Sequence, residues 1–164
     1  MLTPRFSRRF NMICLPEAST QVLQVIFNSI LNGFLTGFSF PEKVRNLGDA
    51  AILSTIEIYN KIQEDLRPTP AKFHYLFNLR DVSKVVQGLC MTKQISVQNE
   101  DTFMRLWTNE SMRVFYDRLI NDEDRVWLKN LMMDLIAKNF KMAPEKDQLF
   151  DVLKFGDLLK LETT

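Results

Sequence analysis

The sequence has few of the residues that most often carry chemistry. Its 164 residues include two cysteines, one histidine and five glycines. Two distant cysteines and a single histidine cannot complete a structural zinc site, and no G-x-x-x-x-G-K-[ST] phosphate loop occurs. His74 has no serine or cysteine nucleophile motif nearby, so we expect it to be a packing or hydrogen-bonding residue. We therefore predict that the chain by itself is not an enzyme and holds no metal.

The chain also lacks an excess of either charge and lacks a clean membrane span. Its 21 basic and 20 acidic residues give a net charge of +1, which argues against a broad nucleic-acid footprint or an acidic lipid surface. The longest apolar run, residues 22–38, carries Gln24, Asn28 and Asn32 at every fourth position. This spacing predicts one polar stripe on a core helix of a folded domain. We expect neither nucleic acid nor membrane as a partner.

Helical periodicity dominates the rest of the sequence and predicts a mainly α fold, a helical bundle. The expected helices cover about residues 20–35, 43–66, 78–89, 101–120 and 122–140. One more short helix in the tail would use Leu149, Val152, Leu153 and Leu158. In the first helix, the side chains expected to be buried are Val22, Leu23, Ile26, Ile30, Leu31 and Phe34.

The N-terminal segment differs from this pattern. Phe10, Met12, Ile13, Cys14 and Leu15 precede the break at Pro16, which suits a short strand. A lone strand needs a neighbour for its backbone hydrogen bonds, so this strand would pair with a sheet outside these residues. Cys14 and Cys90 both stand in apolar runs, and we expect reduced, packed thiols there.

Arg80 occupies an unusual position at the start of the third predicted helix. Asn78 is a good N-cap, and Asp81 three residues later completes an arrangement similar to a capping box. A cation in the first turn opposes the helix dipole at a cost on the order of 0.3 to 1 kcal/mol. Arg80 could pair with Asp81 or with an acid on another helix. Alternatively, it could meet a phosphate at the open end of the helix.

Two further groups of charges invite a functional interpretation. Arg5, Arg8 and Arg9 precede the predicted strand, and they could be a solvated loop or could reach a neighbouring phosphate site as an arginine finger. Asp122, Glu123 and Asp124 open the fifth predicted helix. The dipole favours negative charge there, so helix capping explains these three better than metal binding.

Three long stretches carry a family resemblance. They are "LTPRFSRRFN" (2–11), "TPAKFHYLFNLRDVSKVVQG" (69–88) and "RLWTNESMRVFYDRLINDEDR" (105–125). Together they resemble dynein heavy chain, at the end of the third AAA+ module of the motor ring. The third stretch is closer in sequence to axonemal than to cytoplasmic heavy chains. The resemblance implies that residues 2–15 end the large subdomain, 16–95 form the helical lid, and 96–164 extend toward the next module.

The resemblance also implies roles for the arginines. Arg80 matches the sensor-two arginine, which points at the γ-phosphate of a nucleotide held between large subdomain and lid, with Asn78 and Asp81 supporting it. Arg5 matches the position of an arginine finger, and Arg8 and Arg9 compete for that role. The phosphate loop and the magnesium site would lie upstream, so the fragment would not hydrolyse ATP alone.

At the level of the whole protein, the resemblance implies an ATP-hydrolysing microtubule motor. ATP or ADP with magnesium would be its cofactor, and the lid would couple the nucleotide at the third site to microtubule release. The implied partners are neighbouring AAA+ modules, the microtubule, and dynein intermediate and light chains. The implied location is the cytoplasm and cytoskeleton, in the axoneme of a cilium or flagellum. A separate hypothesis is a self-contained helical interaction module, because the chain has 13 phenylalanines that could dock a partner.

Overall fold

The computed structural model describes residues 3–14, 18–142, 149–150 and 155, and their regular structure is helical throughout. The α-helices are α1 (Pro4–Ser7), α2 (Thr20–Gly37), α3 (Glu42–Arg45), α4 (Gly48–Asp65), α5 (Leu79–Cys90), α6 (Glu100–Val114) and α7 (Asp122–Leu135). Short 3₁₀ turns are η1 (Pro70–Lys72), η2 (Gln94–Ser96) and η3 (Tyr116–Arg118), and η4 (Ile136–Phe140) is a π-helical turn. The predicted mainly α bundle is confirmed.

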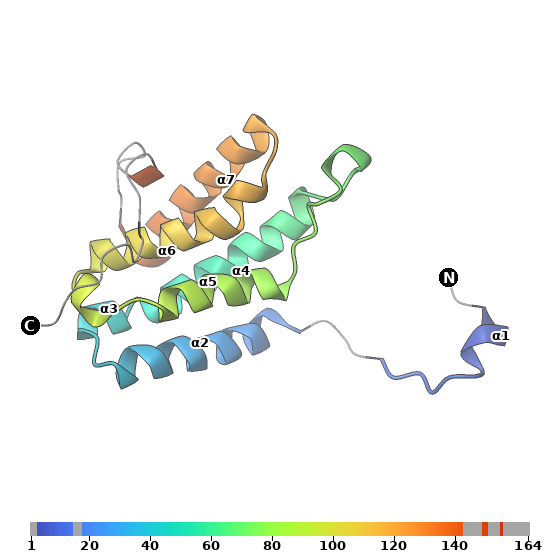
Figure 1. Cartoon of the computed structure of the whole chain (residues 1–164), viewed down its shortest axis with the longest axis horizontal. Helices are drawn as coiled ribbons and strands as arrows, with labels where there is room; N and C mark the ends of the chain where they lie inside the picture. Colours follow the sequence, from blue (N-terminus) through green and yellow to red (C-terminus); the bar gives the residue numbers. More distant parts are fainter. Residues whose placement is uncertain (1–2, 15–17, 143–148, 151–154, 156–164) are drawn as a thin grey trace, which may run out of the picture.

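The long helices form a layered bundle with α4 and α5 in its middle (Figure 1). On one side α2 packs against both α4 and α5, and on the other side α6 packs against α5 while α7 and η4 pack against α4. The short α1 and the residues that follow it lie apart from the bundle as an arm (Figure 1). The start of α5 and the small helix α3 are at opposite ends of the bundle.

One hydrophobic core runs through all layers of the bundle. Trp107 of α6 is fully buried, its Nε1–H donates to Thr55 Oγ1 of α4 at 2.9 Å, and its ring contacts Phe140 of η4 at a centroid distance of 5.1 Å. The apolar periodicity of α4, α5, α6 and α7 is confirmed by buried side chains that include Ala51, Ile52, Ile56, Tyr59, Ile62, Val82, Val85, Val86, Leu89, Phe103, Leu106, Leu128, Met132 and Leu135.

The buried face of α2 differs from the prediction. Its buried side chains are Leu23, Phe27, Leu31 and Leu35, whereas Val22, Ile26 and Ile30 are about half exposed. Because the helix is apolar nearly all round, its periodicity did not identify the face that packs.

The amides of the predicted polar stripe on α2 lie on the packed side instead. Asn32 Nδ2 donates to Asp49 Oδ1 of α4 at 3.0 Å, and Asn28 Oδ1 is buried without a hydrogen-bond partner. The polar stripe thus faces a neighbouring helix, and an apolar strip faces outward.

The predicted N-terminal strand is wrong for the residues that the structure describes. Residues 11–14 have no regular structure, and α1 precedes them. A strand requires a partner for its backbone hydrogen bonds, and the described residues offer none. Cys14 is exposed on this arm rather than packed. Cys90 is half-buried at the end of α5, where burial raises the pKa of its thiol.

Three predicted helices are interrupted, although their positions are right. The one at 43–66 breaks at Asn46 and Leu47 between α3 and α4, where Gly48 starts a new helix. The fourth ends in η3, and the fifth ends in the π turn η4 followed by Lys141 with φ of 56°. Leu149 of the predicted tail helix is buried. Val152, Leu153 and Leu158 lie outside the described residues.

Candidate functional site at the start of α5

The first turn of α5 has the predicted capping box. Asn78 is extended, and its Oδ1 accepts from the backbone N–H of Arg80 at 2.9 Å, while Asp81 Oδ2 accepts from the N–H of Asn78 at 3.0 Å. These bonds satisfy donors that a helix start leaves open. The hydrogen bonds of Asn78 and Asp81 therefore fix the backbone at Arg80, which lies between them.

Asp81 is also the centre of a tertiary ion pair. Arg118 Nη2 donates to Asp81 Oδ1 at 2.8 Å and Nη1 donates to Oδ2 at 3.1 Å, which makes a two-pronged contact. Burial by itself raises the pKa of the Asp81 carboxyl, but the hydrogen bonds from Arg118 and from Asn78 more than offset it. The pKa therefore falls below its ordinary 3.8. Asp81 stays ionised and engaged inside the protein.

Arg80 is left free by this arrangement. Its side chain is exposed, and among the described residues no carboxylate forms an ion pair with it. The expected alternative of a surface pair with Asp81 does not occur, because adjacent side chains of a helix do not face each other and the Asp81 carboxylate is buried against Arg118. In the segment that leads into α5, Phe73, Leu76 and Leu79 expose apolar side chains. The first turn of α5 thus carries an exposed guanidinium that has no ion-pair partner in the described part of the chain.

The loop before α5 is attached to the start of α7. Lys72 Nζ lies 2.6 Å from Asp124 Oδ2, and the Tyr75 hydroxyl donates to the same oxygen at 2.9 Å and accepts from Ile120 N at 2.9 Å. The hydrogen bond to Asp124 raises the pKa of Lys72. Asp124, predicted to serve as helix capping charge, thus has a tertiary role. His74 packs edge-on between two aromatic rings, as expected of a packing residue.

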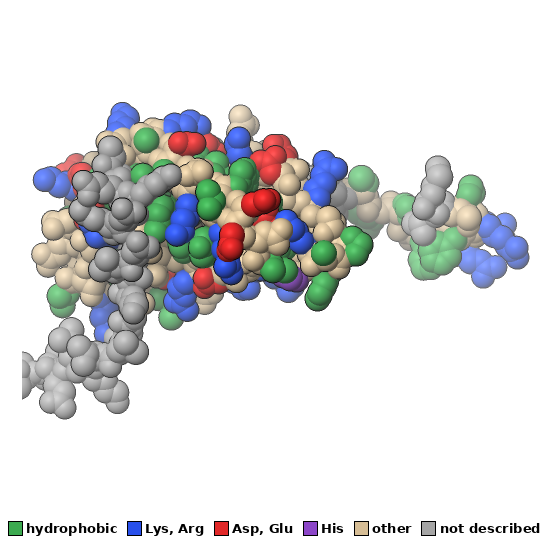
Figure 2. Space-filling model, turned by 90° about the horizontal axis from the view of Figure 1, so that it is seen from above, with side chains coloured by type: hydrophobic (Ala, Val, Ile, Leu, Met, Phe, Trp, Pro, Cys, Tyr) green, Lys and Arg blue, Asp and Glu red, His purple; other side chains and the backbone are tan. Residues whose placement is uncertain are grey.

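Arg5, Arg8 and Arg9 lie on the arm, apart from Arg80. All three are exposed, with Arg5 within α1 and the other two just after it. Figure 2 shows basic side chains gathered at the far end of the arm. Phe6 and Phe10 contact each other there at a ring centroid distance of 4.8 Å. The structure does not bring the two predicted arginine sites together.

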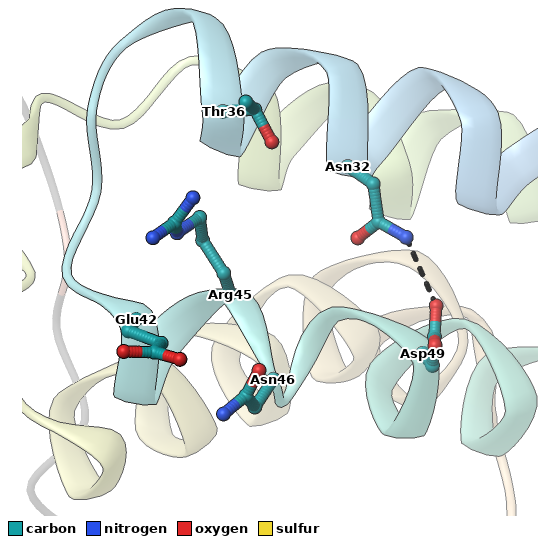
Figure 3. Close-up of a pocket in the computed structure, with 6 residues that line it drawn as sticks. All are labelled: Asn32, Thr36, Glu42, Arg45, Asn46 and Asp49. Carbon is teal, nitrogen blue, oxygen red and sulfur yellow. Dashed lines mark hydrogen bonds between the residues drawn. The ribbon is translucent and has the colours of Figure 1, made fainter.

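A polar hollow of about 400 Å³ lies at the other end of the bundle, between α2 and the segment of α3 and α4. Arg45 points into it, and Glu42, Asn46 and Asp49 line the side opposite α2 (Figure 3). The lining of the hollow combines one arginine, Arg45, with two carboxylates, Glu42 and Asp49. Sequence reasoning did not predict it.

Two other kinds of site are absent from the part of the chain that the structure describes. No group of three or more histidine, cysteine or acidic side chains is placed to hold a metal ion in that part of the chain. Nor does any helix there have the length and apolar character that crossing a membrane requires.

The residue that sequence reasoning missed at this site is Arg118. It lies 37 residues from Asp81, on η3 between α6 and α7. A contact at that separation has no local spacing rule comparable to the capping box. The site as observed is a capped helix start with an exposed arginine, next to an acid that a distant arginine neutralises.

These features define a helical domain with an exposed arginine at a capped helix start, and comparison with known proteins gives its family. The model of the "Dynein heavy chain, ATPase lid domain" matches residues 26–125. The chain is 42% identical over 160 residues to human dynein axonemal heavy chain 6, covering 97% of this chain and 4% of that protein. It is 40% identical over 156 residues to mouse dynein axonemal heavy chain 12, covering 95% of this chain and 5% of that one.

The chain belongs to the dynein heavy chain ATPase lid family. It spans only 4% to 5% of the length of these relatives. The relatives named above are axonemal, in agreement with the predicted preference for axonemal chains. The family match begins within α2 and ends within α7, so it covers the start of α5 and both partners of the ion pair between Asp81 and Arg118.

Proposed function

We propose that the chain is the helical lid over the nucleotide site of the third AAA+ module of a dynein motor, and that Arg80 senses the terminal phosphate. The observation that carries the proposal is the exposed guanidinium of Arg80, which lies at a capped helix start without an acidic partner among the described residues. A planar guanidinium donates two parallel hydrogen bonds to phosphate oxygens. ATP or ADP with magnesium supplies that anion.

Exposed apolar side chains in the segment before α5 support a lid that closes against another surface. Phe73 and Leu76 are largely exposed, which suits contact with the large subdomain that holds the rest of the nucleotide. We propose that residues 2–15 belong to that subdomain, 16–95 to the lid and 96–164 to an extension toward the next module. Arg5, with Arg8 or Arg9 as alternatives, then serves as an arginine finger toward the nucleotide of the preceding module.

In the complete motor the lid acts as a coupling element. Arg80 bonds the terminal phosphate before hydrolysis and loses that bond afterwards, so the angle between lid and large subdomain depends on the nucleotide. The rigid bundle carries this rotation to the neighbouring module and so to release from the microtubule. The setting is a ciliary or flagellar axoneme, with intermediate and light chains as further partners of the whole protein.

The test is Arg80→Met in the complete heavy chain, with Arg113→Met as the matched control. Arg113 is an exposed arginine on α6 that pairs only loosely with Glu110, at 3.9 Å. Arg80→Met should leave folding intact and reduce the preference of the third site for ATP over ADP, together with the ATP dependence of microtubule release. Arg113→Met should change neither. An unchanged ATP preference in Arg80→Met would remove Arg80 from the mechanism.

A second candidate is a helical interaction module, and the outward face of α2 favours it. Val22, Val25, Ile26 and Ile30 form an exposed apolar strip along this helix. The phenylalanine content gives this function less support than the sequence suggested, since Phe27, Phe77, Phe103 and other phenylalanines are buried in the core. A purified chain that captures a defined partner, and loses it on Val25→Asp and Ile26→Asp, would support this function. A chain that stays monodisperse and binds nothing would count against it.

A further inference from the structure

Arg118 connects three parts of the molecule through one guanidinium. It donates to both oxygens of Asp81, at 2.8 and 3.1 Å, and its Nη1 also donates to the carbonyl oxygen of Leu76 at 3.2 Å. The guanidinium carbon lies 4.8 Å from the centre of the Phe77 ring. Arg118 therefore holds the chain just before α5 and the acid in the first turn of α5, from a position on η3.

A continuous chain of hydrogen bonds leads from Arg118 to Arg80. Arg118 binds Asp81, Asp81 Oδ2 accepts from the N–H of Asn78, and Asn78 Oδ1 accepts from the N–H of Arg80. The side chain of Asp81 is only 3% exposed, so water competes little for these bonds. The backbone position of Arg80 thus depends on a residue 38 positions away.

Asp81 is engaged by a second cation besides Arg118. Arg118 donates to both of its oxygens, and Lys84, one turn further along α5, forms an ion pair with Oδ1 at 3.7 Å. Arg80 precedes Asp81 directly, and side chains of adjacent helix residues do not face each other. The fixed position of Asp81 therefore acts on Arg80 through the cap of α5 that both residues share.

The junction between α6 and α7 is attached to this region at a second point. Tyr75 and Lys72, on the loop before α5, both bind Asp124 of α7, and the N–H of Ile120 donates to the Tyr75 hydroxyl. The junction therefore contacts the loop and the cap independently. A movement of η3 relative to α5 would have to break several charge-assisted bonds.

We propose that Arg118 is a positioning residue for Arg80, which holds Asp81 in the cap of α5 and couples the α6–α7 junction to the nucleotide site. This inference rests on the proposed function of Arg80 as a phosphate sensor. Arg118 does not itself touch the nucleotide. Its loss loosens the cap that fixes the backbone of Arg80, so the ligand that suffers is the one with the additional terminal phosphate, ATP, and not ADP.

The experiment measures ATP and ADP affinity at this module in a complete heavy chain whose other phosphate loops are disabled. The variants are Arg80→Met, Arg118→Met, Arg118→Lys, the double Arg80→Met/Arg118→Met, and Arg113→Met as control. Arg118→Met should lower the ratio of ATP to ADP affinity by roughly tenfold, the scale of one lost charge-assisted contact. Arg118→Lys should recover part of it, because lysine keeps the charge without the two-pronged geometry.

The double variant separates positioning from a merely structural role. If Arg118 acts through Arg80, the double variant has the same ATP preference as Arg80→Met alone. Independent, multiplying losses would overturn the inference, as would an equal loss of ATP and ADP affinity in Arg118→Met. Should Arg118→Met fail to fold, Arg118→Lys decides, and full ATP preference in that folded variant would also overturn it.

Failure of the inference and failure of the proposed function give different patterns. If Arg80→Met loses the ATP preference and the Arg118 variants retain it, only the role of Arg118 is wrong. If Arg80→Met keeps the preference, Arg80 is not the sensor, and the positioning role is lost with it.

Discussion

Replacing Asp81 by alanine should destabilise the chain far more than replacing an exposed aspartate does. The change removes the acceptor for the Asn78 N–H, at about 1 kcal/mol for a helix cap. It also removes both bonds to Arg118, at about 1.5 to 3 kcal/mol for hydrogen bonds to a charged group. The Arg118 side chain is 26% exposed and keeps its bond to Leu76 O, so it is not left as a fully buried charge. We expect a loss of about 3 kcal/mol in the free energy of unfolding.

The assay is urea unfolding of the 164-residue chain, followed by circular dichroism and by tryptophan fluorescence. Asp101→Ala is the matched control, because Asp101 pairs with Arg105 within α6 and is 59% exposed. Its loss should be below about 0.5 kcal/mol. Asp81→Asn should fall between the two, since an amide oxygen can still accept from the cap but carries no charge. Equal stability of Asp81→Ala and Asp101→Ala would refute the reasoning.

Three further changes test the packing and the charges. Gly88→Ala places a Cβ 2.6 Å from Glu110 Cδ. We expect the free energy of unfolding in urea to fall by about 1 kcal/mol, since crowding exceeds the gain in helix propensity. Adding Glu110→Ala to the same chain should restore the stability. Thr55→Val leaves the buried Trp107 indole N–H without its acceptor, which should cost about 1 to 3 kcal/mol, whereas Thr55→Ser should cost less. Because the folded pKa of Asp81 lies below 3.8, its contribution to the free energy of unfolding should be complete above pH 3.8 and be lost as pH falls through the lower folded value. Acid titration of wild type and Asp81→Asn checks this, since the difference in stability between the two should shrink over that range.

Local patterns predicted most of the fold. The capping box of Asn78 and Asp81 needs only residues three apart, and the apolar spacing of α4 and α5 needs only one helix turn at a time. Both signals lie within the segment that they describe, and both are confirmed. The start of α2 at Thr20, as expected for the helix predicted over about residues 20–35, is a third example.

Features that depend on contacts between helices were not predictable in the same way. The face of α2 that packs is decided by α4, which takes Asn32 as a partner for Asp49, and no spacing within α2 contains that information. The pair of Asp81 and Arg118 and the cluster around Asp124 likewise join distant segments. The strand was predicted from the composition of residues 10–15 alone, although a strand is defined by its partner.

The site was predicted in part, for the same reason. Position and capping identified Arg80 as a cation in an unfavourable place on a helix. The sequence left open whether an acidic side chain pairs with Arg80. In the structure the neighbouring acid, Asp81, is bound by Arg118 instead. The roles of Arg80 and Arg5 in nucleotide binding remain predictions that follow from the family.

The most direct test is a structure of the complete heavy chain with a non-hydrolysable ATP analogue and with ADP. We predict that the Arg80 guanidinium lies about 3 Å from oxygens of the terminal phosphate at the third site, with Asp81 still bound by Arg118. In the ADP state Arg80 should lose that contact and the lid should change its angle. An Arg80 that faces solvent or pairs with an acid in the ATP state, while another side chain contacts the terminal phosphate, would contradict the proposed role.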